Sequence, residues 1–154
     1  MNIYYGDLFE CPERYDAICV TTNGIVKKDG SAVMGAGIAK MFAQKYPSLP
    51  KNLGEKIKAG GNHAYLLGAV MDKQYAILSF PTKEHFKDKS DIELIKRSCR
   101  ELVAIADRYH LQHIYFPAPG CGLGGLILKD VCAEIEKILD DRFVLVIYEE
   151  DDGT

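Results

Sequence analysis

Two glycine-bearing loops carry the clearest signs of chemistry in this sequence. The first spans residues 34–38 and contains Gly35 and Gly37, and the second spans residues 117–125 and follows a strand-like run. Glycine lets backbone N–H groups approach an anion closely, and the dipole of a following helix favours negative charge at its start. Tight turns are the ordinary use of such loops. Two of them in one domain favour a phosphate-binding site.

Other sequence patterns that are typical of cofactor or catalytic sites lack the surrounding residues that such sites require. Gly120, Gly122 and Gly125 have the G-x-G-x-x-G spacing of dinucleotide sites, but no acidic residue follows at the strand end about 20 positions later. Cys121, between two of these glycines, has no histidine assigned to it by the sequence. No cluster of histidine, cysteine and acidic residues has metal-ligand spacing. We therefore expect no cofactor and no metal.

Length and composition indicate one globular domain. The chain has 154 residues, 47% of them hydrophobic and 27% charged, and a net charge of -3. A general nucleic-acid binder would need a basic excess, although a local basic face remains open. The N-terminus has no signal-peptide pattern, and no apolar run reaches the roughly 20 residues of a membrane span. The five cysteines form no C-x-x-C pair. We expect a cytoplasmic monomer with reduced thiols that does not engage a membrane.

Short strand-like runs alternate with amphipathic helices along the chain. The clearest helix begins with a capping box at Ser90, and its apolar residues keep to one face as far as Ala106. Three further helices are predicted around residues 38–42, 50–60 and 131–139, and strands at 3–5, 17–22, 65–67, 75–80, 113–116 and 143–148. The alternation predicts a three-layer α/β domain, with a central mixed, mostly parallel sheet of about six strands and helices on both faces.

Five segments, in this order along the chain, resemble the macrodomain family. They are Gly-Asp-Leu-Phe at 6–9, Thr-Thr-Asn-Gly at 21–24, Met-Gly-Ala-Gly-Ile-Ala at 34–39, Phe-Pro-Thr-Lys at 80–83 and Gly-Cys-Gly-Leu-Gly-Gly-Leu at 120–126. The sequence is most similar to the branch that holds terminal ADP-ribose glycohydrolase, DNA ADP-ribosyl glycohydrolase antitoxins and small phage and bacterial stand-alone members. The resemblance implies one macrodomain over residues 1–149, followed by an acidic tail at 150–154.

The resemblance implies a binding site for ADP-ribose. Asp7 would accept a hydrogen bond from the adenine amino group beside Leu8, or simply form a turn. Tyr148 would pack near the adenine, or in the core. Asn23 would contact the distal ribose, or form an Asn-Gly turn. The diphosphate and distal ribose would lie between Gly35, Ala36, Gly37 and Ile38 on one side and Pro119, Gly120, Cys121, Gly122, Leu123 and Gly124 on the other.

The resemblance also implies hydrolysis of ADP-ribosyl linkages on a nucleic acid or a protein, with Lys83 as the nucleophile. Its amine would attack the anomeric carbon of the distal ribose and form a Schiff-base-type intermediate, which requires a neutral amine. Asn23 would hold the ribose, and His85 would transfer protons near neutral pH. Without the resemblance, Lys83 and His85 would be interpreted as ordinary surface side chains.

Two features differ from some members of the family, although the antitoxin-like relatives share Gly-Leu-Gly-Gly in the second loop. Gly124 stands where the glutamyl-ADP-ribose hydrolases carry an aspartate, which removes the acid–base partner of Lys83 and leans the substrate towards nucleic acid. A binding module without chemistry, and a phosphatase acting on ADP-ribose phosphate through Asn23, therefore remain as alternatives. The segment 25–32 is also long, and would be either a mobile lid or a surface excursion.

Overall fold

A six-stranded sheet forms the centre of the molecule, in the order β1-β6-β5-β2-β4-β3. The computed structural model describes residues 1–10, 15–70, 75–122 and 124–148. The strands are β1 (Asn2–Tyr5), β2 (Ala17–Thr22), β3 (Leu66–Val70), β4 (Tyr75–Pro81), β5 (Ile114–Pro117) and β6 (Phe143–Ile147). Every pairing among them is parallel except that of β3 with β4. The loops that follow the parallel strands therefore meet at one edge of the sheet.

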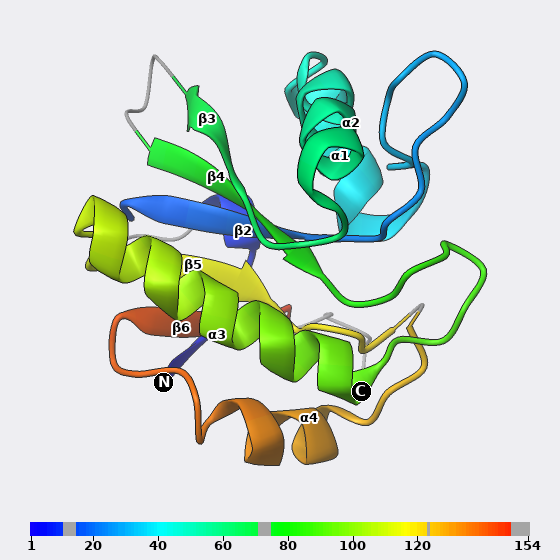
Figure 1. The fold of residues 1–154 in the computed structure, drawn as a ribbon. Helices are drawn as coiled ribbons and strands as arrows, with labels where there is room; N and C mark the ends of the chain where they lie inside the picture. Colours follow the sequence, from blue (N-terminus) through cyan, green and yellow to red (C-terminus); the bar gives the residue numbers. More distant parts are fainter. Residues whose placement is uncertain (11–14, 71–74, 123, 149–154) are drawn as a thin grey trace.

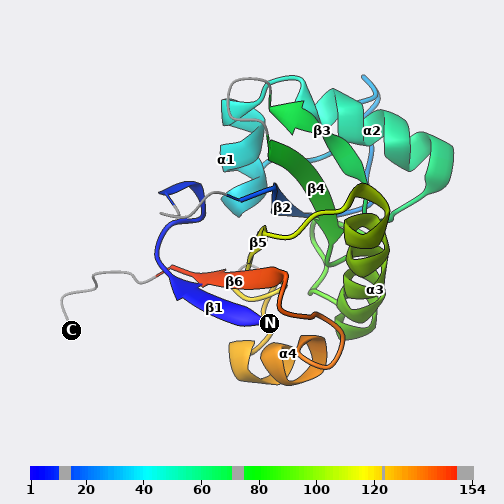
Figure 2. The same cartoon turned by 90° about the vertical axis from the view of Figure 1, so that its left-hand side faces the viewer.

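Helices cover both faces of this sheet (Figures 1 and 2). They are α1 (Gly37–Lys45), α2 (Leu49–Gly60), α3 (Ile92–Tyr109) and α4 (Leu128–Ile135), with a short 3-10 turn, η1 (Leu8–Glu10). Residues of α1 and α2 share one core with the sheet, and residues of α3 and α4 share the other. The predicted three-layer α/β fold with a mostly parallel sheet is confirmed. None of the described helices is long and apolar enough to cross a lipid bilayer.

The two cores explain why the first four residues of β2 are all apolar. Ile18 and Val20 of β2 face the core beside α1 and α2, while Ala17 and Cys19 face the core beside α3 and α4. All four side chains are fully buried. A parallel strand with helices on both faces has no solvent side, so it does not alternate apolar with polar residues.

The start of α3 lies one residue later than predicted. Asp91, rather than Ser90, is the N-cap, and its Oδ1 accepts hydrogen bonds from the backbone N–H groups of Glu93 and Leu94 at 2.9 and 3.5 Å. Aspartate caps a helix about as well as serine does. The prediction of Ser90 as the cap is therefore wrong, and the helix makes no use of the Ser90 side chain.

The end of α4 also differs from the prediction. The helix stops at Ile135, whereas the apolar pattern predicted that it continues to residue 139. The chain goes on in a tighter turn, in which the N–H of Ile138 donates to the carbonyl of Ile135 at 3.0 Å. Leu139 is nevertheless buried in the core. The apolar pattern predicted the burial of Leu139 correctly, but a buried residue at this position does not have to lie in a helix.

The long segment between β2 and α1 is a packed hairpin. Val26 and Ala32 form an antiparallel bridge, and the N–H of Ala32 donates to the carbonyl of Pro50 at 2.8 Å. Gly54 of α2 lies so close to the carbonyl of Gly30 that a Cβ there would overlap it. These contacts fix the hairpin to α2, and they favour the surface excursion over the lid.

Candidate ligand-binding and catalytic site

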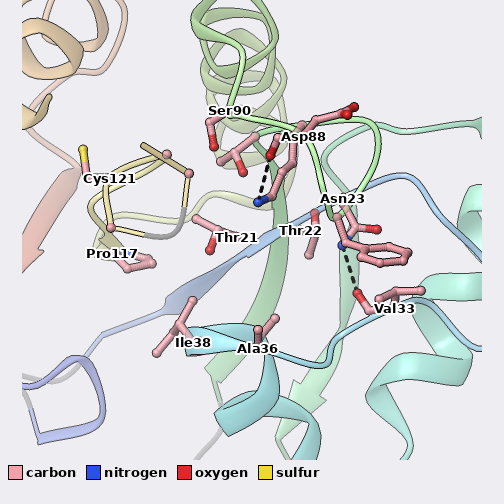
Figure 3. A pocket seen from close by; sticks show the side chains of 18 of the residues that line it. Thr21, Thr22, Asn23, Val33, Ala36, Ile38, Asp88, Ser90, Pro117 and Cys121 are labelled. Carbon is pink, nitrogen blue, oxygen red and sulfur yellow. Dashed lines mark hydrogen bonds between the residues drawn. The ribbon is translucent and has the colours of Figure 1, made fainter. Parts of the chain in front are cut away.

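A cavity of about 750 Å³ opens where β2, β4 and β5 end (Figure 3). Its size lies within the usual range for small-molecule sites, about 300–1,000 Å³. Ten of the predicted site residues line it: Asn23, Gly35, Ala36, Gly37, Ile38, Lys83, Gly120, Cys121, Gly122 and Gly124. The structure thus brings both glycine loops and the candidate nucleophile to one hollow, although 78 residues separate the two loops along the chain.

The first glycine loop places the start of α1 at this cavity. Ala36 is the N-cap residue in an extended conformation, and the helix begins at Gly37. Among the described residues no side chain caps this end, and the first turn holds no acidic residue. The first N–H groups of a helix have no partner within the helix and carry the positive end of its dipole. This wall of the cavity is therefore suited to a phosphate.

The second glycine loop forms the opposite wall. Gly120 and Gly122 have φ angles of 76° and 84°, which side chains rarely adopt, so the turn depends on glycine here. The N–H of Leu126 donates to the carbonyl of Gly120 at 2.9 Å and closes the loop. Pro119, in the same loop, is buried and is not among the described residues that line the cavity. Leu123 lies outside the described residues, so the structure gives no account of its predicted role.

Cys121 lies in the same loop with a half-buried thiol. Its Sγ is 3.6 Å from the carbonyl oxygen of Pro119. Burial, and to a smaller extent the neighbouring Cys132, raises the pKa of the Cys121 thiol above its ordinary value. A nucleophilic cysteine needs the opposite shift, because the thiolate is the reactive form. Cys121 is accordingly a wall residue of the cavity rather than a nucleophile.

Gly124 packs directly against Ser90. The N–H of Ser90 donates to the carbonyl of Gly124 at 3.0 Å. A Cβ at position 124 would overlap Ser90 Oγ and would lie 2.5 Å from the carbonyl oxygen of Gly120. No side chain fits at this position without a shift of the loop. The second loop thus packs so closely on the start of α3 that position 124 has no room for an acidic side chain.

Asn23 lies at the cavity wall with its carboxamide bound to the hairpin. Its Nδ2 donates to the carbonyl of Val33 at 3.1 Å, and its Oδ1 accepts from the N–H of Ile25 at 3.0 Å. The side chain is nearly buried. Asn23 therefore joins the two ends of the hairpin and holds the chain that leads into the first glycine loop. Its predicted contact with the distal ribose stays a prediction.

Lys83 is the second residue after β4 and is half-buried in the wall of the cavity. Its Nζ lies 3.4 Å from the backbone carbonyl oxygen of Asp88, a hydrogen bond drawn in Figure 3. Its own carbonyl accepts from Nδ2 of Asn62 at 3.2 Å, which fixes the backbone at this point. The amine is anchored by a neutral carbonyl, and the described residues place no carboxylate within ion-pair distance of it.

His85 is close to Lys83 in sequence but does not line the described cavity. Its ring stacks on that of Phe86, with the centroids 4.2 Å apart and the planes at 27°. Its Nδ1 accepts a hydrogen bond from the N–H of Lys87 at 3.1 Å. In the neutral imidazole this leaves the proton on Nε2. The His85 ring thus packs on Phe86, and its predicted proton transfer stays a prediction.

Three predicted adenine-side residues lie together, further along the same edge of the sheet. Asp7 begins η1 by accepting the N–H of Phe9 at 2.8 Å, and Leu8 is buried. Tyr148 directly follows β6, which pairs with β1, so it lies beside the turn that holds Asp7. The Tyr148 side chain is 67% exposed. Packing of Tyr148 in the core is therefore wrong, while its contact with adenine stays a prediction.

Several lining residues escaped the sequence interpretation. Phe86, Lys87 and Asp88 lie in an irregular turn after Lys83, where no periodic pattern marks the residues that face the cavity. Thr22 and Ser90 bring buried hydroxyl oxygens to the wall, with no partner among the described residues. The capping-box spacing pointed to Ser90, but for a different role. The described residues contain no group of three His, Cys, Asp or Glu side chains that would hold a metal ion.

The known proteins that are similar to this chain are macrodomains and ADP-ribosyl glycohydrolases. The family model for the Macro domain matches residues 28–135. The DNA ADP-ribosyl glycohydrolase of Thermus aquaticus is 29% identical over 143 residues, covering 88% of this chain and 36% of the relative. Human ADP-ribose glycohydrolase OARD1 is 29% identical over 136 residues, covering 88% of this chain and 81% of the relative. The chain thus spans about a third of the length of the bacterial enzyme and most of the human one.

The fold comparison extends over nearly the whole chain. The solved structure of Thermosipho africanus DarTG in complex with ADP-ribose has a TM-score of 0.75 and 26% identity, covering 98% of this chain and 42% of that one. The relatives come from bacteria and a mammal alike, so they do not indicate an origin. The residues matched by the family model include both glycine loops. The chain belongs to the macro domain family, as the five ordered motifs predicted.

Proposed function

We propose that this protein binds ADP-ribose in the cavity and hydrolyses the bond between the distal ribose and a modified group. One observation carries the proposal: the amine of Lys83 lines the same hollow as the two glycine loops and the start of α1. A phosphate-binding wall beside a lysine is the arrangement that a nucleophile for a phosphate-linked sugar requires. The names of the bacterial and human relatives are those of glycohydrolases.

We propose one direction for the ligand along the cavity. The diphosphate would lie against the N–H groups at Gly37 and Ile38 and across to the second glycine loop. The adenine would extend towards the ends of β1 and β6, where Asp7, Leu8 and Tyr148 are neighbours. The distal ribose would lie at the other end, between Asn23 and Lys83. Each of these contacts is part of the proposal.

The proposed reaction proceeds through Lys83. The Nζ lone pair forms a bond to the anomeric carbon, the bond to the modified group breaks, and that group leaves with a proton from water. Opening of the sugar ring gives an imine, and a second water hydrolyses the imine to free ADP-ribose and the amine. Because position 124 has no room for an acid, water at the open cavity mouth has to supply and accept the protons. We therefore expect slow turnover.

A binding module without chemistry is the second candidate function. The packing of Gly124 favours it, because the acid that would assist Lys83 cannot be accommodated there. Such a module would bind ADP-ribose through the same loops and release nothing. The two candidates make the same prediction for binding and opposite predictions for product release.

Calorimetric titration with ADP-ribose, with AMP and NAD as controls, tests the site. Absence of saturable binding to the wild type would refute both candidates. Incubation of ADP-ribosylated oligonucleotide and ADP-ribosylated peptide, followed by detection of free ADP-ribose and of inorganic phosphate, separates a glycohydrolase from a binding module and from a phosphatase.

Variants of two lysines in the same segment test the mechanism. Lys83→Ala should abolish release of ADP-ribose while leaving the affinity for ADP-ribose within a few-fold. Lys89→Ala, an exposed lysine that does not line the described cavity, is the matched control. Borohydride added during turnover should trap an adduct on Lys83 in the wild type and in Lys89→Ala only. Full activity of Lys83→Ala would refute the lysine nucleophile but not the activity.

We also propose a reducing compartment, such as the cytoplasm, and a monomer as the working unit. The four cysteines that the structure describes are free thiols, and Cys19 and Cys99 are buried in the core where they cannot exchange. Both glycine loops and Lys83, which form the proposed site, come from the same chain. Sedimentation of the protein with and without ADP-ribose tests the monomer.

A further inference from the structure

An exposed aromatic ring lies at the cavity beside the candidate nucleophile. Phe86 is three residues after Lys83, lines the same cavity, and is 42% exposed. Single exposed apolar side chains are common on protein surfaces and need no explanation by themselves. The position of Phe86 is what matters, since a group attached to the anomeric carbon near Lys83 would leave the cavity on this side.

The backbone around the ring is fixed on both sides. The carbonyl of Lys83 accepts from Asn62 at 3.2 Å, and the carbonyl of Glu84 accepts from the N–H of Gly24 at 2.8 Å. On the other side, the N–H of Asp88 donates to the carbonyl of His85 at 3.0 Å. The ring is therefore presented on a turn that is tied to β2 and to the end of α2. A rigid aromatic side chain loses little conformational entropy when a partner packs on it.

The ring itself is braced from behind. His85 stacks on it at 4.2 Å, and the His85 ring is oriented by the hydrogen bond that Nδ1 accepts from Lys87. Nζ of Lys87 lies 5.9 Å from the centre of the Phe86 ring and also borders the cavity. The ring is thus a flat apolar surface with a cation over it. Planar bases stack on aromatic rings, and a nearby cation attracts the phosphates that accompany them.

From this arrangement we infer that Phe86, supported by His85, is a stacking platform for a nucleobase joined to the distal ribose, and that it makes a base-linked ADP-ribosyl group the preferred substrate. The inference rests on the proposed function, because it assumes that ADP-ribose fills the cavity. Phe86 is a specificity-determining residue in this view. A carboxylate-linked ADP-ribosyl peptide offers no planar ring at this position and gains nothing from the platform.

The test compares three ligands with one set of variants. Lys83→Ala serves as the background, so that conjugates are not consumed, and affinities are measured for free ADP-ribose, a short single-stranded oligonucleotide with one ADP-ribosylated base, and a glutamate-linked ADP-ribosyl peptide. Phe86→Leu removes the aromatic face but keeps an apolar side chain, and Phe86→Trp keeps a face. Tyr109→Leu, an exposed aromatic residue at the end of α3, is the matched control.

Phe86→Leu should weaken binding of the oligonucleotide conjugate about 5- to 150-fold, since base stacking contributes about 1–3 kcal/mol. Binding of ADP-ribose and of the peptide conjugate should stay within twofold, and Phe86→Trp should restore oligonucleotide binding. Equal weakening of all three ligands would mean that Phe86 only supports the cavity, and an unchanged oligonucleotide affinity, or preference for the peptide conjugate, would also overturn the inference. Failure of the wild-type protein to bind free ADP-ribose would instead refute the proposed function.

Discussion

At Gly124 the backbone lies against Ser90 so tightly that even a methyl group has no space. Gly124→Ala places a Cβ onto Ser90 Oγ and close to the carbonyl of Gly120. Overpacking of this kind costs about 1–3 kcal/mol. Gly35→Ala is the control, because a Cβ there meets nothing within 4 Å and the φ angle of Gly35 is not positive. Urea unfolding should show a lower free energy of unfolding for Gly124→Ala and little change for Gly35→Ala; equal values would contradict the packing argument.

The sequence predicted the glycines that line the cavity and missed several lining residues that lie in an irregular turn. The glycines at 35, 37, 120 and 122 can be recognised from the sequence, because few other residues can approach an anion so closely or adopt a positive φ angle. Nothing in the local sequence indicates that Phe86 lines the cavity. It reaches the cavity because the turn after Lys83 is tied to Gly24 and Asn62, and neither contact has a signature in the local sequence.

The contact between α2 and the hairpin decides how the first glycine loop is supported. In an exposed helix Gly→Ala gains up to about 1 kcal/mol of stability. At Gly54 the Cβ would overlap the carbonyl of Gly30, which is backbone and cannot rotate away. The steric cost should exceed the gain in helix propensity, so we expect Gly54→Ala to lower the free energy of unfolding by about 1–3 kcal/mol.

Hydrogen exchange in this variant locates the effect. The amides of Ala32 and Val33, which bond to Pro50 and Ile25, should exchange faster in Gly54→Ala, while those of α3 exchange at wild-type rates relative to global stability. A variant that is as stable as the wild type or more so would mean that the hairpin moves aside freely, which would restore the interpretation of residues 25–32 as a lid.

Element types were predictable because burial on both faces of the sheet leaves few alternatives. β2 is apolar at every position that faces a core, and α3 keeps its apolar residues on one face for 18 residues. Boundaries were less predictable. Ser90 and Asp91 are both good caps, and the choice between them depends on Gly124, which lies more than 30 residues away and binds the N–H of Ser90. The first turn of α3 is thus fixed by tertiary contact.

For the whole molecule, the order of the strands determines where the ligand can lie. The chain places β5, β2 and β4 side by side, and the cavity is formed where these strands end. β1 and β6 continue the same edge on the side where the adenine is proposed to lie. An extended ligand with a ring at one end and a sugar at the other fits such a row of strand ends better than a compact one does.

The core beside α3 also predicts how the stability of the molecule depends on pH. Cys19 and Cys99 are fully buried there; burial, and for Cys19 also the charge of Cys99, raises both pKa values, that of Cys99 to about 12. Above about pH 9 the unfolded chain loses these protons while the folded chain keeps them. The free energy of unfolding should therefore fall as the pH rises, by about 1.4 kcal/mol per pH unit for each buried thiol.

Variants that remove one thiol separate its contribution to the pH dependence of stability from that of other groups that titrate at alkaline pH. Urea unfolding at several pH values between about 8 and 11 should give a shallower decline for Cys99→Ala than for the wild type, whatever the loss of stability at pH 7. Cys132→Ala, at a half-buried position in α4, should change the slope less. Parallel pH profiles for the wild type and Cys99→Ala would show that the thiol ionises in the folded protein, and that the core between the sheet and α3 admits water.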